Sequence, residues 1–267
     1  ALADAGLSRG ERADAALIIG AVGGGMLEGE AWYWEETRTG RPSPRITALR
    51  SILPYTHAET LGWRLGIGGP KETIVMACAS GAASVALGAD LIRRGKVTRA
   101  LVGGVDALTR ICFMGFNALK LLAPEPCRPF DRARNGMSIG EAAAFLVLED
   151  ADACRARGGH AHAEFLGAGM TTDAHHVTSP QPEGEGMARA MELALADAAL
   201  PPRSVHYVNA HGTGTLQNDR TEVLSIKRVF GNHSRRLCVS STKSQVGHLV
   251  AAAGAVEQTP TPFALQL

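Results

Sequence analysis

The strongest constraint on the fold is an order of elements that occurs twice: an apolar strand, a polar turn, and then a helix made largely of alanine and glycine. The first copy covers residues 74–90 (IVMACASGAASVALGAD) and the second covers residues 239–257 (VSSTKSQVGHLVAAAGAVE). In the first copy, small apolar side chains cover nearly every side of the helix, so we expect it to be enclosed by protein. The repeated order predicts a duplicated unit.

Strand and helix patterns alternate along the rest of the chain. Short apolar runs bounded by glycine or polar residues predict strands, and longer runs predict helices. This alternation is typical of the α/β class, which we predict here. Strands are expected at residues 15–20, 72–77, 99–103, 142–148, 163–170, 205–210 and 237–241. Helices are expected at residues 46–65, 79–94, 149–157, 185–199, 220–230 and 248–257.

Composition disfavours several classes of function. The 27 Lys and Arg residues nearly balance the 26 Asp and Glu residues, so no strong field favours nucleic acid or an anionic membrane surface. The longest apolar stretch, at residues 249–256, is well short of the roughly 18 residues that a membrane span needs. The glycines at residues 23–25 lack dinucleotide-binding spacing, and GIGGPKET at residues 66–73 lacks phosphate-loop spacing. We therefore expect a soluble protein that recognises its ligand in a pocket.

Cysteine and histidine spacing points away from disulfides and metals. The five cysteines are odd in number, widely spaced and without a C-x-x-C pair, and a reducing cytoplasm is the expected location. The pairs His160/His162 and His175/His176 have no cysteine or carboxylate cluster beside them. We expect surface roles for these histidines and no metal site.

Cys78 follows a predicted strand and precedes a predicted helix. Unpaired N–H groups and the positive end of the helix dipole favour a reactive thiolate at such a place. The alternative is a buried structural cysteine, which is the more common state of an arbitrary cysteine. The position alone leaves both interpretations open.

Two histidines in the second half occupy comparable positions. His211 follows the strand expected at residues 205–210 and opens HGTGT, whose glycines permit an unusual backbone at the carboxyl end of that strand. His248 opens the second Ala/Gly-rich helix, where the helix dipole should keep its ring neutral and able to donate a hydrogen bond. Taken singly, each is more commonly a structural histidine.

Charged residues accompany both histidines. Lys243 lies in a Ser/Thr turn five residues before His248, and Asp219 and Glu222 follow His211. A lysine between a strand and a buried helix needs a partner, and Glu222 is the predicted one. The alternative is a solvated surface charge.

Four stretches of this chain carry a specific resemblance: residues 77–90 (ACASGAASVALGAD), 129–150 (PFDRARNGMSIGEAAAFLVLED), 209–219 (NAHGTGTLQND) and 240–257 (SSTKSQVGHLVAAAGAVE). They occur in the order, and with roughly the separations, of the β-ketoacyl synthases of type II fatty acid synthesis and of related polyketide synthase domains. The chain resembles this family over nearly its whole length. The resemblance implies a thiolase-like layered αβαβα fold of two duplicated halves, with the cysteine in residues 1–158 and both histidines in residues 159–267.

The resemblance also implies a Cys-His-His active site for decarboxylative condensation. The cysteine would accept an acyl chain from the phosphopantetheine thioester of acyl carrier protein. Malonyl thioester would then lose CO2, and the enolate, stabilised by the two imidazoles, would attack the acyl-cysteine. No cofactor is needed, because the thioester is already activated. The catalytic residues implied are Cys78, His211, His248 and Lys243, supported by Glu222 and Asp219.

Substrate contacts and partners follow from the same resemblance. Phe113, Met114 and Phe116 are expected to border the acyl channel, with ordinary core packing as the alternative. Thr213 and Thr215 are assigned to substrate binding. The implied partners are an acyl carrier protein loaded with acyl or malonyl phosphopantetheine and a second copy of the chain in a homodimer.

The sequence departs from the family pattern mainly at its ends. Family members begin with a strand carrying a Val-Thr-Gly type motif and end with a Gly-Phe-Gly-Gly-Thr-Asn loop; because neither occurs, both ends are expected to be cut. A backbone N–H of that loop completes the family's oxyanion hole, and losing one such donor costs about 10²–10³ in rate. Pro260 and Pro262 stand where a helix should continue, and Leu216 and Gln217 replace a Pro and a small or apolar residue.

Three other functions compete with condensation. A thiolase acting on coenzyme A thioesters usually carries a second cysteine where this chain has the later histidine motif. A non-catalytic subunit resembling chain-length factors would lack the nucleophilic cysteine, although an inactive fragment would not. A papain-like protease pairs Cys with His, but its signature around the cysteine is missing.

Overall fold

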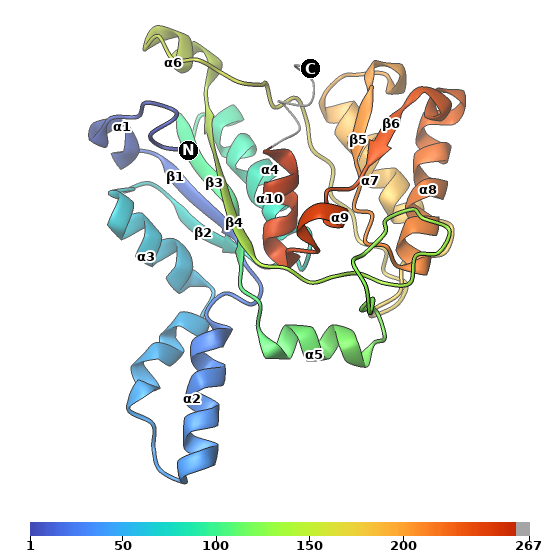
Figure 1. The fold of residues 1–267 in the computed structure, drawn as a ribbon. Helices are drawn as coiled ribbons and strands as arrows, with labels where there is room; N and C mark the ends of the chain where they lie inside the picture. The colour runs from blue at the N-terminus through green and yellow to red at the C-terminus, as the bar shows by residue number, and fades with distance from the viewer. Residues whose placement is uncertain (260–267) are drawn as a thin grey trace. The chain divides into compact units, whose positions relative to one another are not determined.

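The computed structural model describes residues 1–259, and packing divides the chain into two compact units (Figure 1). The first unit comprises Ala1–Met114, Gly140–Glu164 and Leu249–Leu267, of which residues 249–259 are described. The second unit comprises Gly115–Ile139 and Phe165–His248. The units interleave along the sequence, so they differ in kind from the duplicated halves expected to meet near residue 158. That boundary stays a prediction.

A four-stranded sheet forms the centre of the first unit, in the order β2-β1-β3-β4. β1 pairs in parallel with β2 and β3, and β4 pairs antiparallel with β3. All five residues of β1 are buried, as its purely apolar sequence predicts. The strands are β1 (Ala16–Gly20), β2 (Lys71–Ile74), β3 (Arg99–Asp106) and β4 (Ala142–Glu149).

The prediction of a buried strand at residues 72–77 is wrong in burial and in length. β2 ends at Ile74, and none of its four residues is buried. It is the edge strand of the sheet, and among residues 1–259 only β1 pairs with it. Beyond Ile74 the chain leaves the sheet to make the turn that precedes the first Ala/Gly-rich helix.

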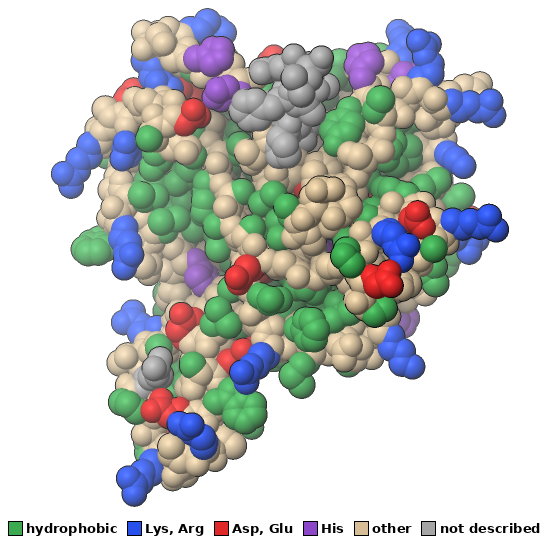
Figure 2. Space-filling model, in the orientation of Figure 1, with side chains coloured by type: hydrophobic (Ala, Val, Ile, Leu, Met, Phe, Trp, Pro, Cys, Tyr) green, Lys and Arg blue, Asp and Glu red, His purple; other side chains and the backbone are tan. Residues whose placement is uncertain are grey.

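The helices of the first unit differ sharply in burial. α2 buries none of its residues, and Figure 2 shows hydrophobic side chains beside charged ones over the region of α2 and η1. The helix expected at residues 46–65 forms as two elements, η1 and α3, which lie on either side of Pro54. The elements are α1 (Arg9–Ala13), α2 (Met26–Thr39), η1 (Pro44–Ile52), α3 (Tyr55–Leu65), α4 (Ser80–Arg93), α6 (Ala151–Ala156), η4 (Val250–Ala252) and α10 (Ala253–Gln258); α5 (Arg110–Ala118) runs from this unit into the second.

The two Ala/Gly-rich helices, α4 and α10, pack with their backbones almost in contact. A Cβ added to Gly81 would lie 2.7 Å from the carbonyl oxygen of Ala251, and one added to Gly254 would lie 2.8 Å from the backbone nitrogen of Ala82. Seven residues of α4 and all three of η4 are buried. The enclosed helix predicted at residues 79–94 is thereby confirmed, and the small residues are what let the helices approach.

Replacing Gly81 by alanine is expected to destabilise the protein by about 1–3 kcal/mol, because the new methyl group meets backbone atoms that cannot rotate away. Gly10→Ala is the matched control: Gly10 lies in α1, and a Cβ added there would have no neighbouring atom within 4 Å. That control should be neutral or stabilising by up to about 1 kcal/mol. Urea unfolding of both variants measures the difference, and equal midpoints would contradict close packing of α4.

The second unit contains a parallel pair of strands, β5 and β6, in register Tyr207↔Cys238. α8 begins at Leu216, four residues before the start expected from the sequence. Its elements are α7 (Glu185–Asp197), η2 (Pro202–Ser204), β5 (Tyr207–Asn209), α8 (Leu216–Phe230), η3 (Gly231–Arg236), β6 (Cys238–Ser240) and α9 (Lys243–Val246).

The strand predicted at residues 163–170 is wrong, because no strand forms there. Instead, the glycines of this segment lie against α7. A Cβ on Gly167 would lie 2.6 Å from the backbone nitrogen of Ala198, and one on Gly169 would overlap the carbonyl oxygen of Ala190. Contact with a helix backbone has replaced pairing with a strand.

The α/β class is confirmed by this arrangement of helices and sheets. Across residues 1–259, no helix has both the length and the apolar character required to cross a bilayer.

Candidate active site

Cys78 lies in a tight turn between β2 and α4. The Ser80 hydroxyl accepts a hydrogen bond from the Met76 N–H (2.8 Å) and donates one to the Ala77 carbonyl (2.7 Å). Ala77 has φ of +47°, a left-handed conformation that is costly for a residue with a side chain. Ser80 is fully buried, so these two bonds hold the strained turn away from competing water.

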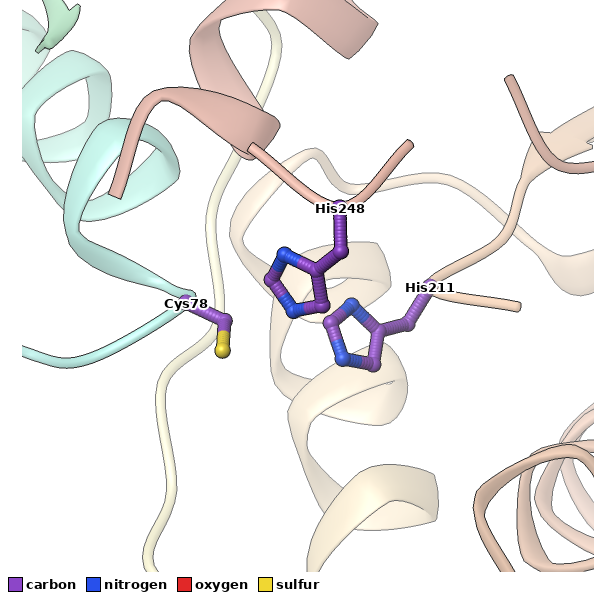
Figure 3. A group of neighbouring side chains, drawn as sticks. All are labelled: Cys78, His211 and His248. Carbon is purple, nitrogen blue, oxygen red and sulfur yellow. The ribbon is translucent and has the colours of Figure 1, made fainter. Parts of the chain in front are cut away.

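The turn presents the half-buried Cys78 side chain ahead of the first residue of α4 (Figure 3). The N-terminus of a helix carries unpaired N–H groups and favours negative charge. Gly20, the last residue of β1, approaches this end closely, because a Cβ there would lie 2.6 Å from the Gly81 nitrogen. The first unit thus supplies a thiol at a helix N-terminus, as the sequence predicts.

His211 follows β5 and is held through its backbone by Glu222 of α8. Glu222 accepts hydrogen bonds from the His211 N–H (2.7 Å, Oε1) and the Gly212 N–H (2.8 Å, Oε2). Gly212 has φ of +38°, and a Cβ there would lie 2.5 Å from the Ser241 Cβ. Burial raises the pKa of Glu222, and the two backbone donors partly offset that shift. Glu222 therefore fixes the chain direction at His211.

Asp219 holds the next part of the same loop. Its carboxylate accepts from the Gly214 N–H (3.1 Å) and the Phe130 N–H (2.7 Å), and the Arg134 Nε lies 3.5 Å away. Asp219 is 1% exposed, so these contacts compensate a fully desolvated carboxylate. Phe130 itself has φ of +61°, which shows how firmly this connection is held.

His248 completes a pair of imidazoles. The backbone N–H of His248 donates a hydrogen bond to the Ser138 carbonyl at 2.6 Å, and the His248 residue is 1% exposed. The rings of His211 and His248 meet edge to face, with centroids 5.2 Å apart and planes at 89° (Figure 3). The ring of Phe116 also lies near His248, with centroids 6.3 Å apart and planes at 35°.

Both imidazoles are held neutral. Burial, followed by the charge of Lys243, lowers the pKa of His248 to about 3. Burial, Lys243 and His248 together lower the pKa of His211 well below its usual value. The sequence predicts a neutral His248, with the dipole of the following helix as the expected cause. In the structure α10 begins only at Ala253, and burial and Lys243 are the causes.

Lys243 is buried, with 1% of its surface exposed, and its position is fixed through its backbone. Its N–H donates to the Ser241 hydroxyl (3.3 Å), which in turn donates to the Gly212 carbonyl (2.8 Å). Its carbonyl accepts from the Cys127 thiol (2.9 Å) and from the Gly247 N–H (2.9 Å). The alternative of a solvated surface charge is therefore wrong for Lys243.

The residues assigned to substrate binding fall into two groups. Phe113 and Met114 are 49% and 66% exposed, so core packing does not explain them. Thr213 and Thr215 are buried, and their hydroxyls lie 2.9 Å apart. Leu216, where the family pattern has proline, is 63% exposed at the start of α8. Pro260 and Pro262 lie outside the described residues.

The sequence patterns miss several residues that organise these loops. Asp106, buried at the end of β3, accepts from the N–H groups of Gly23 (2.7 Å), Gly24 (3.2 Å) and Ala251 (3.1 Å). It joins three distant segments of the first unit. Cys127 is missed in the same way. The contacts of Asp106 and Cys127 are with residues far away in the sequence, and no motif beside either residue predicts them.

Two family models match this chain. The model for "Beta-ketoacyl synthase, N-terminal domain" matches residues 1–153, and the model for "Beta-ketoacyl synthase, C-terminal domain" matches residues 162–267. Among curated proteins, 3-oxoacyl-[acyl-carrier-protein] synthase 2 of Staphylococcus aureus is 43% identical over 247 residues. That alignment covers 90% of this chain and 61% of the relative.

Two solved structures show the same fold. The structure described as "The ishigamide ketosynthase/chain length factor" aligns with a TM-score of 0.92 and 35% identity, over 99% of this chain and 66% of that one. A type II PKS acyl-carrier protein in complex with its ketosynthase aligns with a TM-score of 0.94 and 28% identity, over 100% and 69%. The chain thus spans roughly three fifths to two thirds of the length of the proteins that it matches.

Proposed function

The chain belongs to the β-ketoacyl synthase family, and from this we propose that it joins an acyl thioester to malonyl-acyl carrier protein by decarboxylative condensation. The product is a β-ketoacyl thioester two carbons longer than the acyl chain. The observation that carries the proposal is the pair of neutral imidazoles, 5.2 Å apart, beside a buried lysine. A thiol at the head of α4 supplies the second requirement.

In the first half-reaction the Cys78 thiolate attacks the carbonyl carbon of an acyl thioester. A C–S bond to Cys78 forms, the bond to the phosphopantetheine sulfur breaks, and the carrier leaves as a thiolate that takes up a proton. The helix N-terminus favours the attacking anion. The turn held by Ser80 keeps the sulfur ahead of α4 while the acyl group is in place.

In the second half-reaction the malonyl thioester loses CO2. The electron pair of the broken C–C bond passes into an enolate, whose oxygen accepts hydrogen bonds from the neutral His211 and His248 rings. The enolate carbon then attacks the Cys78 thioester, and the C–S bond breaks to regenerate the thiolate. Protonated rings would bind the malonyl carboxylate and oppose its loss, so the lowered pKa of each histidine suits this step.

The remaining assignments belong to the same proposal. Lys243 keeps the rings neutral, Glu222 and Asp219 hold the His211 loop, and Phe113, Phe116, Thr213 and Thr215 contact the acyl or phosphopantetheine chain. The partner is an acyl carrier protein, which one structural relative binds, and the chain pairs with a second copy in the cytoplasm. The reaction draws on thioester chemistry alone.

The test supplies the protein with an acyl-acyl carrier protein and malonyl-acyl carrier protein. We expect release of CO2 and a β-ketoacyl-acyl carrier protein in equal amounts, measured by mass spectrometry of the carrier. Product formed with coenzyme A thioesters alone would point to a thiolase. Binding of the carrier with neither CO2 nor product would point to a non-catalytic subunit and contradict the proposal.

A further inference from the structure

One sequence motif, PFDRARNGMS, supplies none of the chemistry proposed above, yet its surroundings contact the histidine loops repeatedly. We call residues 127–139 the bracing segment. Within the second unit, its Gly136 N–H donates to the Gly214 carbonyl at 3.0 Å, and its Phe130 N–H donates to Asp219 at 2.7 Å. Both contacts hold the loop that follows His211.

Two further contacts bracket the stretch that runs from Lys243 to His248. At one end the Cys127 thiol donates to the Lys243 carbonyl, with sulfur and oxygen 2.9 Å apart. At the other end the Ser138 carbonyl accepts from the His248 N–H at 2.6 Å. The Cys127 N–H also donates to the Ser138 hydroxyl at 3.1 Å, so the two residues that contact Lys243 and His248 are hydrogen-bonded to each other.

The thiol reaches Lys243 from outside its own loop. Two other backbone contacts of Lys243, with Ser241 and Gly247, come from nearby in sequence. Cys127 lies 116 residues away along the chain and is 4% exposed, so its sulfur is shielded from water. A thiol is a weak donor, but one without a solvent competitor still favours a single position of the carbonyl.

The position of Lys243 matters because its charge acts on both rings. The charge of Lys243 lowers the pKa of both rings, and that of His248 also lowers the pKa of His211. The carboxylates of Glu222 and Asp219 accept from backbone N–H groups of the His211 loop. Coulomb interaction weakens with distance, so a lysine that drifts outward would hold the rings neutral less effectively.

We propose that Cys127 is a positioning residue, whose thiol fixes the Lys243 backbone and thereby the placement of the ammonium group beside His211 and His248. The sulfur takes no part in bond formation. The expected effect on the rate of decarboxylation rests on the proposed function. The expected effect on the protonation midpoints of His211 and His248 does not.

The test compares Cys127→Val, which fills the space without a donor, with Cys127→Ser, which keeps a donor. Histidine ring signals are followed by NMR between about pH 2.5 and 8, a range that includes the lowered His248 midpoint, and the kcat and KM of malonyl decarboxylation are measured alongside. In the wild type we expect both rings to be neutral at neutral pH, because burial and Lys243 lower the pKa of each. In Cys127→Val we expect their midpoints to rise by about one pH unit and kcat to fall about tenfold, with KM little changed. Cys127→Ser should restore both, and Cys154→Val, a buried cysteine in α6, should change neither.

The ring titrations decide the proposal even if no condensation is found. A change in Cys127→Val that Cys127→Ser reverses supports positioning by the thiol. Unchanged titrations in both variants, or an equal change in both, would overturn it. If Cys127→Val fails to fold, Cys127→Ala takes its place. A shift of the ring midpoints in Cys127→Ala, with wild-type midpoints in Cys127→Ser, would give the same support. Unchanged ring midpoints in Cys127→Ala would overturn the proposal.

Discussion

Replacing Cys78 by alanine is expected to abolish acylation of the protein and to lower condensation by about a thousandfold or more, as the loss of a nucleophile typically does. Incubation with an acyl-acyl carrier protein should raise the mass of the wild type by one acyl group, and peptide mapping should place that group on Cys78. The variant should gain no mass. Its fold should be unchanged, because Cys78 lies half-buried in a turn held by Ser80 rather than in the core.

Cys238→Ala is the matched control, because Cys238 is exposed in β6 and lies outside the proposed chemistry. It should be acylated as the wild type is. An adduct that persists in Cys78→Ala, or that moves to another cysteine without loss of turnover, would remove Cys78 from the mechanism. Loss of acylation with retained release of CO2 would separate the two half-reactions and place the decarboxylating groups elsewhere, as we propose for the histidines.

The local parts of this fold could be predicted because their signals are local. The apolar run of β1 and the small residues of α4 specify burial without reference to distant segments. The turn at Cys78 and the loop after His211 could also be predicted, since a serine and a glycine lie close after Cys78 and two glycines follow His211. The left-handed backbone at Ala77 could not be predicted, because alanine rarely adopts it. The roles of these residues in catalysis stay a prediction.

Contacts between distant segments could not be predicted in the same way. The apolar character of residues 72–77 does not reveal that β2 lies at the edge of the sheet. Residues 163–170 have a strand-like composition, but α7 rather than a strand lies against their glycines. Asp106 and Cys127 bind backbone groups that follow more than a hundred residues later, and single-sequence patterns carry no information at that separation.

The neutral state of His248 shows the same limit in energetic terms. From the sequence, a neutral ring was expected because His248 precedes an Ala/Gly-rich helix. In the structure, burial and the charge of Lys243 are what lower the pKa of the ring. The distinction matters, because a dipole effect of about 0.3–1 kcal/mol would leave the ring titrating near its usual pH. Burial of a cation beside another positive charge is costly enough to move the titration by several pH units.

That difference predicts a large pH dependence of stability. The pKa of His248 is about 3 in the folded protein, against the ordinary histidine value of 6.5 that applies to the unfolded chain. Between these values the unfolded chain binds more protons, so the free energy of unfolding falls as the pH drops below 6.5 and stops falling near pH 3. The slope is half of its full value of about 1.4 kcal/mol per pH unit at pH 6.5 and approaches that value below, so His248 alone should cost about 2 kcal/mol between pH 6.5 and pH 4.5.

His248→Asn removes this titration while keeping a polar side chain in the same place. Urea unfolding of the wild type and the variant is measured at a series of pH values from 7.5 to about 4.5. The slope of the free energy of unfolding against pH is compared between the two proteins, so any loss of stability that the variant shows at neutral pH does not affect the comparison. His211 adds to the wild-type slope with the same sign, because its folded pKa is also lowered. Glu222 acts with the opposite sign, since its raised pKa lets the folded state retain a proton above 4.5. Both remain in the variant. The loss of His248 also removes one of the causes that lower the His211 pKa, which reduces the variant's slope in the same direction, so the difference between the two slopes reports the His248 titration together with its coupling to His211. Parallel slopes would mean that the ring is protonated as readily in the folded protein as in the unfolded chain, and a protonated ring could not serve as the neutral donor that decarboxylation requires.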